Sequence, residues 1–493
     1  MLPIGDELAL LDAAQTRVLE QRASASLPPH TLMRRAGASV ARLALALAPH
    51  AQRFWIAAGS GNNGGDGLQA AVNLLMAGKS VEVSLLGDAA KLPADAAEAL
   101  ACAQSAGVSI GTALSPSAVP QFALDALLGV GASRAPVGTI AAGIRALNAL
   151  TCPTLAVDLP SGLHASTGQP LGADCVTASH TLAMLTLKPG LFTATGRDHA
   201  GKVWLDELGV ERGADAPCAW LSGLRAAPPR RHAQHKGSFG DVAVVAGSPG
   251  MGGAALLAAR AAHAAGAGRV YVELLDRSPT APRVDAIRPE LMFRDDWVQG
   301  SAASIARTTV VCGCGGGDAV RAPLPRLLSL AHRLVLDADA LNALAADTGL
   351  ATLLRARAAR GHATVLTPHP LEAARLLAAT AAEVQADRLR AARELADRFA
   401  CVVVLKGSGS VIAAPGEVPR VNSTGNASLA SAGTGDVLAG WLGGRWAQRA
   451  SGDEASTAFD AARRAVAEHG AAAEPPPPGA LRAGDVIDRL YAG

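Results

Sequence analysis

Aromatic residues and net charge are both scarce in this chain. Phe, Trp and Tyr make up 3% of the 493 residues, and the formal net charge is +2. Proteins that bind nucleic acid use clustered basic residues to neutralise phosphates and aromatic side chains to stack on bases. Neither feature is evident in the sequence, so we expect no nucleic-acid partner.

The seven cysteines form no paired framework. Disulfide scaffolds and structural zinc sites use cysteines in complete sets at short, regular spacings. Cys312 and Cys314 are two positions apart, but no second pair of ligands accompanies them. We therefore expect both to be small buried residues beside a glycine loop rather than zinc ligands.

The sequence also lacks the pattern of a secretory signal or a membrane helix. Asp6 and Glu7 stand where a signal peptide has basic residues before an apolar run. The longest uncharged span, residues 99–124, consists mostly of small residues and is interrupted by Pro116 and Pro120. We expect a cytoplasmic protein without a membrane partner.

Hydrophobic residues are plentiful, at 49% of the chain, and the length predicts two or three domains with sizeable cores. Between Trp220 and His235 the sequence becomes basic and contains the run Pro228-Pro-Arg-Arg231, which is typical of a linker. We assign residues 1–215 to a first domain, 216–231 to the linker and 232–493 to a second domain.

The first half reads as an α/β structure. Helical spacing covers Leu8–Ala25 and residues 32–47, and an apolar strand follows at Phe54–Ala58. After a glycine-rich loop, a helix from Leu68 leads to a strand at Val81–Leu86. This βαβ order implies a parallel sheet, in which ligands bind at the carboxyl ends of the strands.

The loop that follows the first of these strands is rich in oxygen atoms. Asn62, Asn63 and Asp66 add carbonyl and carboxylate oxygens to a glycine-rich backbone. Oxygen donors suit a hard cation, and free backbone N–H groups suit phosphate. Asn-Gly is also a common turn signal, so a plain turn remains an alternative.

Further polar residues follow other predicted strands in the first half. Asp125 ends one strand, and Asp158 and Ser161 follow another. Together with the acidic loop after the first strand, they would converge on one edge of the sheet, which favours a site over separate helix caps. Lys188 could complement the charge of Asp158.

The second half repeats the pattern, with strands that nearly all end in polar or glycine-rich loops. His369 follows one strand, and Lys406 follows another beside a Gly/Ser loop suited to phosphate. His369 could instead serve in the core or as a cap, and Lys406 could be a surface lysine. The order predicts an α/β sandwich with its site along one edge.

The stretch Ser428–Gly440 carries one carboxylate, Asp436, after two glycines and before an apolar run. Gly433 and Gly435 permit a sharp turn and close approach of a ligand. If a helix begins at Val437, its free N–H groups attract an anion, and an acid beside them could activate a hydroxyl for phosphoryl transfer. A glycine turn whose acid caps a helix is the alternative.

Four motifs of the first half resemble the NAD(P)H-hydrate epimerase domain: Asn62-Asn-Gly-Gly-Asp66, Asp125-Ala-Leu-Leu-Gly, Val157-Asp-Leu-Pro-Ser-Gly162 and Leu187-Lys-Pro-Gly190. The resemblance implies a Rossmann-like αβα domain that interconverts the R and S forms of hydrated NAD(P)H and holds potassium. Asp158 would be catalytic, with Lys188 as an acid/base helper, and Asn63, Asp125 and Ser161 would hold the potassium ion. The implied substrate-binding residues are Asn62, Asn63, Gly64, Gly65, Asp66, Gly129, Val130, Gly131, Ala132, Ser133, Arg134, Ala135 and Asp158.

Motifs of the second half resemble the ADP-dependent NAD(P)H-hydrate dehydratases: His235-Lys-Gly-Ser-Phe-Gly240, Gly247-Ser-Pro-Gly-Met-Gly-Gly-Ala254, Asp337-Ala-Asp-Ala-Leu-Asn342, Thr367-Pro-His-Pro370, Lys406-Gly and Ala432-Gly-Thr-Gly-Asp436. The resemblance implies a ribokinase-like αβα domain with Asp436 as the catalytic base. Its implied substrate-binding residues are Ala254, Gly317, His369 and Asp436. Its implied ADP- or AMP-binding residues are Lys406, Gly407, Ser408, Gly409, Ser410 and Gly435.

Three positions depart from these family patterns. Arg34 stands where a Glu is common, Leu371 replaces the Gly that usually follows the TPHP motif, and Cys312–Gly317 replaces a GPGLG-like loop. The last two departures alter loops beside the expected pocket. Arg34 bears on partner contacts rather than on chemistry.

Together the resemblances imply a bifunctional repair enzyme that acts on the small molecules NADHX and NADPHX. Its implied cofactors are potassium and ADP as co-substrate, with Mg²⁺ as a further candidate, and such domains often form homo-oligomers. One alternative is a ribokinase-like small-molecule kinase fused to a nucleotide-binding regulatory domain, which would leave a stable phosphorylated product. Another is a nucleotide sensor with degenerate sites, although Asp158, Lys188, Lys406 and Asp436 are all present.

Overall fold

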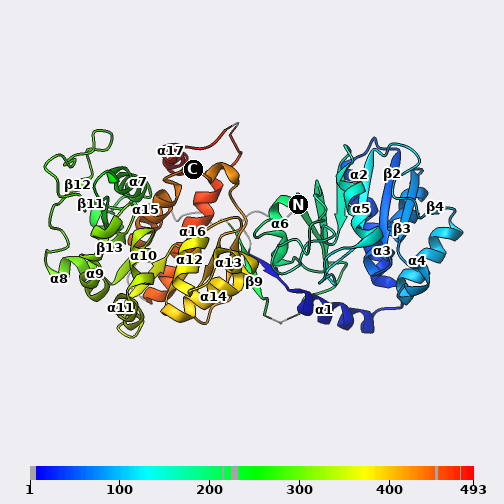
Figure 1. The fold of residues 1–493 in the computed structure, drawn as a ribbon, viewed down its shortest axis with the longest axis horizontal. Coiled ribbons are helices and arrows are strands. Elements are labelled where there is room, and N and C mark those ends of the chain that lie inside the picture. Colours follow the sequence, from blue (N-terminus) through cyan, green and yellow to red (C-terminus); the bar gives the residue numbers. More distant parts are fainter. Residues whose placement is uncertain (1–6, 214–215, 224–230, 450–452, 478, 493) are drawn as a thin grey trace. The chain divides into compact units, whose positions relative to one another are not determined.

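The computed structural model describes residues 7–213, 216–223, 231–449, 453–477 and 479–492. Most of these residues fall into two compact units, Leu8–Ala219 and Trp220–Gly493 (Figure 1). Residues 224–230 of the predicted linker lie outside the described residues, whereas Ala219–Ser222 forms a strand, β9. No helix in the described part of the chain is long and apolar enough to cross a membrane.

The first unit is built on a parallel sheet in the order β4-β3-β2-β5-β6-β7-β8. The chain moves outward from β2 to β4 and then returns to the other side of β2, so the order reverses between β2 and β5. The strands are β1 (Leu8–Leu10), which lies outside this sheet, β2 (Arg53–Gly59), β3 (Ser80–Leu86), β4 (Ser109–Gly111), β5 (Phe122–Ala126), β6 (Thr154–Val157), β7 (His180–Met184) and β8 (Lys202–Asp206). The helices are α1 (Ala13–Ser26), α2 (Thr31–Leu47), α3 (Asn62–Met76), α4 (Ala94–Ser105), α5 (Gly138–Asn148) and α6 (Gly196–Ala200).

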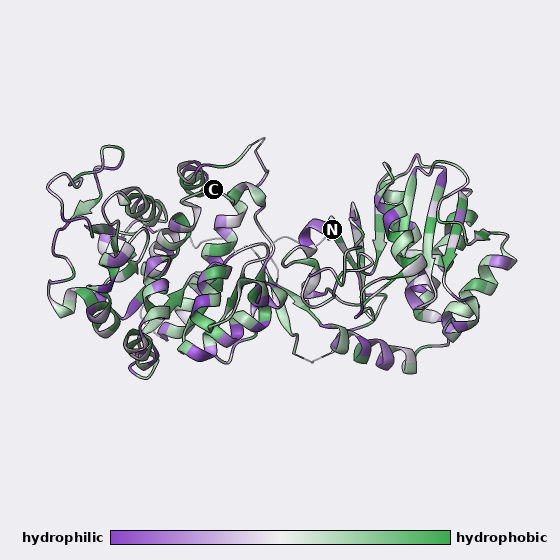
Figure 2. Ribbon diagram, in the orientation of Figure 1, coloured by the Kyte–Doolittle hydropathy of each residue, from purple (hydrophilic) through white to green (hydrophobic). Residues whose placement is uncertain are grey.

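Both faces of this sheet are buried, as a parallel sheet between helices requires. Alternate residues of β2 point to opposite faces, so Phe54 and Ile56 enter a core shared with α2, α3 and α4. Trp55 and Ala57 enter a second core with α5. Figure 2 shows the hydrophobic colour concentrated on the strands and both colours on the helices that cover them.

Two sequence predictions for the first unit are corrected by the structure. The helix expected over Leu8–Ala25 begins only at Ala13, because Asp12 caps it: the Asp12 carboxylate accepts the Gln15 N–H at 2.8 Å. The loop expected up to Gly67 is already helical from Asn62. Glycine allows that helix to start tightly against the sheet, since a Cβ on Gly64 would lie 1.9 Å from the carbonyl oxygen of Gly59.

In the second unit the strands run in the order β9-β18-β17-β16-β15-β14-β13-β10-β11-β12. They are parallel from β16 to β12, β17 is antiparallel to both of its neighbours, and the order reverses between β13 and β10. The strands are β9 (Ala219–Ser222), β10 (Asp241–Ala246), β11 (Arg269–Leu274), β12 (Met292–Phe293), β13 (Thr309–Cys312), β14 (Arg333–Leu336), β15 (Ala363–Leu366), β16 (Val402–Leu405), β17 (Val411–Ala413) and β18 (Arg420–Asn422). The helices are α7 (Gly252–Ala264), α8 (Ala302–Arg307), α9 (Leu324–Leu330), α10 (Asp339–Ala346), α11 (Thr348–Ala358), α12 (Pro370–Leu377), α13 (Ala381–Ala386), α14 (Arg388–Phe399), α15 (Thr434–Ala447), α16 (Glu454–Ala471) and α17 (Ala483–Ala492).

Helices α7 and α15 pack against each other with almost no space between their backbones. A Cβ on Gly440 of α15 would lie 1.9 Å from the carbonyl oxygen of Ala258 in α7, and one on Gly444 would lie 2.5 Å from that of Ala262. Val242 and Val244 of β10 and Trp441 of α15 belong to the same core. Glycine is therefore required at this helix crossing for steric reasons.

We predict that Gly440→Ala destabilises the second unit by about 1 to 3 kcal/mol, because the added methyl group forces the two helices apart. Differential scanning calorimetry would detect the lower unfolding temperature of that unit. Gly484 of α17 is the matched control, since a Cβ there meets no atom within 4 Å. Gly484→Ala should leave the unfolding temperature unchanged or raise it slightly, and equal losses in both variants would contradict the packing argument.

Candidate active sites

A pocket of about 500 Å³ opens at the carboxyl edge of the first sheet, at the point where the strand order reverses. It lies among the ends of several parallel strands, and α1 contributes to its wall. Eight of the predicted binding residues line it: Asn62, Asn63, Asp66, Gly129, Val130, Gly131, Ala132 and Asp158.

The remaining predicted binding residues of the first unit do not line this pocket. Gly64 and Gly65 are buried in the first turns of α3, where a Cβ on Gly65 would lie 2.5 Å from the Met33 side chain. Ser133, Arg134 and Ala135 are exposed in the loop after β5. Their assignment to substrate binding stays a prediction.

Asp158 and Lys188 form a buried ion pair beside the pocket. Lys188 is fully buried, and its Nζ also donates to the carbonyl oxygen of Met184 at 2.9 Å. The second oxygen of Asp158 accepts the N–H of Val130 at 3.2 Å. Asp158 has a φ of 68°, a conformation that L-residues rarely adopt, so the surrounding contacts hold its carboxylate against local backbone strain.

Two acidic residues of this pocket, Asp66 and Glu20, have raised pKa values, chiefly because they are buried. Burial, followed by the charges of Asp158 and Glu20, raises the pKa of Asp66 well above its usual value. Burial and Asp158 also raise the pKa of Glu20, which lies on α1 and lines the pocket. Sequence reasoning missed Glu20 and its neighbour Arg17, because nothing in the spacing of α1 marks the face that meets the pocket.

The predicted potassium ligands lie at the base of these loops. Asp125 is fully buried and accepts the Ser161 N–H at 2.7 Å and the Ser161 hydroxyl at 2.5 Å. Burial raises the pKa of Asp125 to about 6 despite these hydrogen bonds. Both polar atoms of the buried Asn63 amide have no hydrogen-bond partner in the structure. An unpaired buried amide oxygen, a carboxylate and a hydroxyl are oxygen donors of the kind that a hard cation such as potassium prefers.

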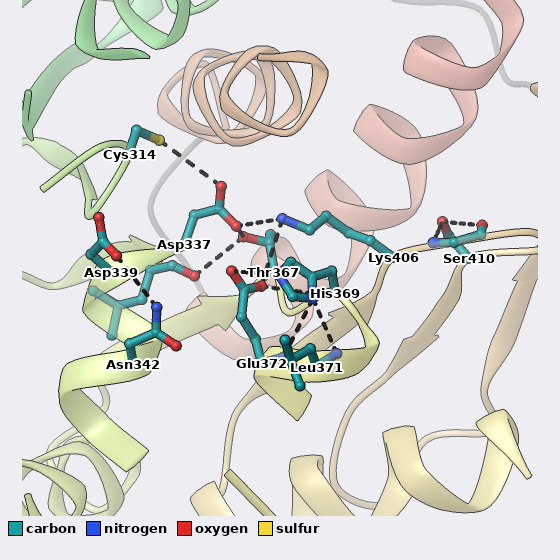
Figure 3. A network of polar contacts seen from close by, with 12 residues as sticks. Cys314, Asp337, Asp339, Asn342, Thr367, His369, Leu371, Glu372, Lys406 and Ser410 are labelled. Carbon is teal, nitrogen blue, oxygen red and sulfur yellow. Dashed lines mark hydrogen bonds and ion pairs between the residues drawn. The ribbon is translucent and has the colours of Figure 1, made fainter. Parts of the chain in front are cut away.

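The second unit brings its predicted site residues to the carboxyl edge of its own sheet (Figure 3). Asp337 follows β14, His369 follows β15 and Lys406 follows β16. Lys406 Nζ lies 2.7 Å from Asp337 Oδ1, which also accepts the Thr367 hydroxyl at 2.8 Å. The structure thus pairs Lys406 with an acid that sequence reasoning did not assign, although its place directly after a strand was a signal.

His369 caps the helix that follows it, which was one of the uses left open by the sequence. Its Nδ1 accepts the N–H groups of Leu371 and Glu372, at 3.1 and 3.4 Å, and Glu372 in return accepts the N–H of His369 at 2.7 Å. Burial raises the pKa of Glu372 to about 7. Glu372 also lies 4.0 Å from Lys406 Nζ, so this capping box links the helix to the charged cluster.

A buried arginine, Arg388, holds the backbone at the start of the Gly/Ser loop after Lys406. The guanidinium of Arg388 donates to the carbonyl oxygens of Leu405 and Lys406, at 3.0 and 3.1 Å. Gly407 has a φ of 135°, and Ser410 closes the turn through its hydroxyl, which accepts the Gly407 N–H at 3.3 Å. Arg388 thereby fixes the end of β16, a role that its position in an amphipathic helix did not reveal.

Two other predicted substrate contacts flank the reversal point between β10 and β13. Gly317 donates its N–H to Asp339 at 2.8 Å, and a Cβ on it would lie 3.0 Å from the Ser248 hydroxyl. Ala254 lies in the first turn of α7, against the glycine loop that contains Cys314. Gly317 therefore lies at the sheet edge, although Cys312–Gly317 stands where the family has a GPGLG-like loop. The contact of Gly317 with substrate stays a prediction.

Asp436 lies in the first turn of α15, which begins at Thr434 rather than at Val437 as the sequence suggested. Gly433 precedes the helix with a φ of 87°, and a Cβ on Gly435 would lie 3.4 Å from Lys406 Nζ. Burial and the nearby Asp337 raise the pKa of Asp436 to about 6. A carboxylate with this pKa beside a lysine and a helix N-terminus is suited to accept a proton near an anionic ligand.

His469 of α16 supports this turn, and sequence reasoning missed it because only packing brings the two helices together. Its Nε2 lies 3.0 Å from the carbonyl oxygen of Thr434. Burial lowers the pKa of His469 from 6.5 to about 4. Between these values the unfolded chain binds more protons than the folded one, so stability falls as the pH falls.

We predict that the second unit loses up to about 3 kcal/mol of stability through His469 as the pH falls from about 6.5 to 4. In His469→Gln the amide can still donate to Thr434 but does not titrate. The unfolding temperature of the variant, followed by Trp fluorescence, should therefore fall less steeply over this pH range than that of the unaltered chain. Parallel pH profiles would show that His469 is not responsible.

The sequence matches two family models and several characterised relatives. Residues 29–190 match the family described as YjeF-related protein N-terminus, and residues 242–478 match NAD(P)H-hydrate dehydratase. The bifunctional NAD(P)H-hydrate repair enzyme Nnr of Escherichia coli is 36% identical, over 90% of this chain and 85% of that relative. The bifunctional NAD(P)H-hydrate repair enzyme of Leishmania braziliensis is 38% identical, over 92% and 86%.

Among solved structures, the chain is similar to the ADP/ATP-dependent NAD(P)H-hydrate dehydratase of Bacillus subtilis, co-crystallised with ATP and Mg²⁺. The two are 28% identical, with a TM-score of 0.43, over 54% of this chain and 92% of that one. The matches to full-length relatives extend across both units and both carboxyl-edge sites. The chain therefore belongs to the family of bifunctional NAD(P)H-hydrate repair enzymes.

Proposed function

We propose that this chain returns hydrated nicotinamide dinucleotides to their functional form in two steps. The first unit interconverts the R and S forms of NADHX and NADPHX, and the second dehydrates the S form while ADP is converted to AMP and phosphate. The observation that carries this proposal is the presence of two separate sheet-edge sites, each with its own acid–lysine pair. Family membership supports repair over a small-molecule kinase.

In the first unit Asp158 is the group that meets the substrate, because it lines the pocket while Lys188 is fully buried behind it. Epimerisation at C6 requires the hydroxyl to leave and to return on the other face of the ring. Asp158 moves the proton in these steps. Lys188 holds the Asp158 carboxylate in position and balances its negative charge through their ion pair. Asn62, Asp66 and the Gly129–Ala132 loop bind the dinucleotide around this centre.

Asn63, Asp125 and Ser161 are the residues that would hold potassium. When bound, the ion supplies a fixed positive charge that organises the loops after β2, β5 and β6. The support for this assignment is the unpaired amide of Asn63 together with the fully buried carboxylate of Asp125, which is hydrogen-bonded to Ser161.

Potassium is expected to raise the unfolding temperature of the first unit, because an ion that binds only the folded state stabilises it. Calorimetry in KCl and in choline chloride at equal ionic strength would measure the shift. Asp125→Asn should lose it while the second unit stays unchanged. The assignment fails if the variant responds to potassium as the unaltered chain does.

In the second unit Lys406 and the Gly407–Ser410 loop bind the phosphates of ADP, and Gly435 leaves room for them beside Lys406. Asp436 accepts the proton of the substrate's hydroxyl as that oxygen takes the phosphoryl group from ADP. Phosphate then departs from C6 with its bonding electrons and a proton is lost from C5 to solvent, which restores the C5–C6 double bond of the reduced nicotinamide. Ala254, Gly317 and His369 contact the hydrated ring, and Mg²⁺ is a candidate companion of ADP.

The two activities are separable in one experiment with a mixture of NADHX epimers and ADP, followed by nicotinamide absorbance and released phosphate. The unaltered chain should consume the whole mixture. Asp436→Asn should slow dehydration by about 10² to 10⁴ but still exchange R and S. Asp158→Asn should consume the S fraction enzymatically and then stall, apart from slow spontaneous exchange.

The two variants serve as folding controls for each other. In each variant, the activity of the altered unit is compared with the activity of the unaltered unit in the same chain. Wild-type-like dehydration by Asp436→Asn would overturn the assignment of the base. A stable phosphorylated product without released phosphate would indicate the kinase instead. A homo-oligomeric, cytoplasmic enzyme is the form that the family resemblance favours.

A further inference from the structure

Three potential metal ligands from distant parts of the sequence meet in the second unit. Cys314 comes from the loop after β13, Asp337 from the end of β14 and Asp436 from the first turn of α15. One ligand atom from each lies within 4.8 Å of the other two. We propose that these residues form a binding site for a thiophilic divalent cation such as Zn²⁺ or Cd²⁺, which inhibits dehydration when it binds.

The two carboxylate oxygens of Asp337 face different partners. Oδ1 is held by Lys406 Nζ at 2.7 Å and by the Thr367 hydroxyl at 2.8 Å. Oδ2 points the other way, to the Cys314 sulfur at 4.0 Å, as Figure 3 shows. Lys406 therefore neutralises Asp337 on one side and leaves the other oxygen for a cation.

The gap between sulfur and oxygen matches the size of a bridging ion. Bonds of about 2.3 Å from zinc to sulfur and about 2.0 Å to oxygen span two atoms at this separation with only small movements. Thiol and carboxylate contacts at 4.0 Å are too long for a strong hydrogen bond, so little is lost when an ion replaces the contact. Asp436 supplies the third ligand and, being half-buried, leaves a path for entry.

The loop that carries Cys314 is held in position by its glycines. Gly313 and Gly315 have φ values of 119° and 55°, and a Cβ on Gly313 would lie 2.0 Å from the carbonyl oxygen of Asp337. The thiol is fully buried and directed at Asp337. Such a fixed sulfur donor, which releases its proton when it binds a metal, favours zinc or cadmium over magnesium or potassium, which prefer oxygen ligands.

The ion would occupy the carboxylate that the proposed mechanism uses as its base. The metal site stands on the geometry of the three ligands, whereas the inhibition also rests on the proposed role of Asp436. Because the epimerase site lies in the other unit and uses Asp158, its activity in the same chain is an internal control.

Cys314→Ala tests the site, and Cys312→Ala is its matched control. Cys312 is also fully buried and only two residues away, but it ends β13 outside the core that contains Cys314. Dehydration would be measured with ZnCl₂ at fixed ADP, so that all chains meet the same free metal. We expect Cys314→Ala to need at least about tenfold more zinc for half-inhibition, whereas Cys312→Ala behaves as the unaltered chain does.

A direct measurement of metal binding distinguishes the proposed metal site from the proposed role of Asp436 as base. Co²⁺ added to the full chain should give a thiolate-to-cobalt charge-transfer band in the unaltered chain and in Cys312→Ala but not in Cys314→Ala. The metal site would be overturned if both cysteine variants kept the band, or if both lost it. A Cys314-dependent band without inhibition would keep the site and overturn the role of Asp436 as base.

Discussion

A charged group can remain inside a protein only if another group compensates its charge and its hydrogen bonds. Both units meet this constraint with a lysine and an aspartate at the carboxyl edge of a parallel sheet. Lys188 and Asp158 pair in the first unit, and Lys406 and Asp337 in the second. In each case the two residues follow different strands of the sheet, so the pair links two strand ends.

The two pairs nevertheless differ in how they serve the chemistry. In the first unit the lysine is hidden and the aspartate is presented to the pocket. In the second unit the aspartate is hidden, while Lys406 lies next to the loop that would hold phosphate. The same interaction therefore presents a carboxylate to the pocket in one unit and places an ammonium group beside a glycine-rich loop in the other.

The sequence predicted the parallel α/β architecture well, because apolar strands followed by glycine-rich or acidic loops leave a strong local pattern. It failed at helix starts, since α3 and α15 extend into motifs that look like loops. The start of α3 depends on Gly64, which admits the neighbouring Gly59 carbonyl, and the start of α15 depends on Gly433, which has a φ of 87°. Both requirements are tertiary or conformational information that the spacing of apolar residues does not carry. Asp125, Asp158 and Asp436 could be found from the sequence because they stand at strand ends or in distinctive motifs. Glu20, Arg388 and His469 could not, because only packing brings them to the sites.

The close crossing of α7 and α15 has a consequence for how the second unit can move. Gly440 joins the middle of α15 to α7 almost backbone to backbone, and His469 holds the carbonyl of Thr434 at its start. Asp436 is thereby mounted on a rigid scaffold with little freedom to swing. The first turn of α15 is thus tied to two neighbouring helices, so the position of the Asp436 carboxylate is set by helix packing rather than by the loop that precedes it.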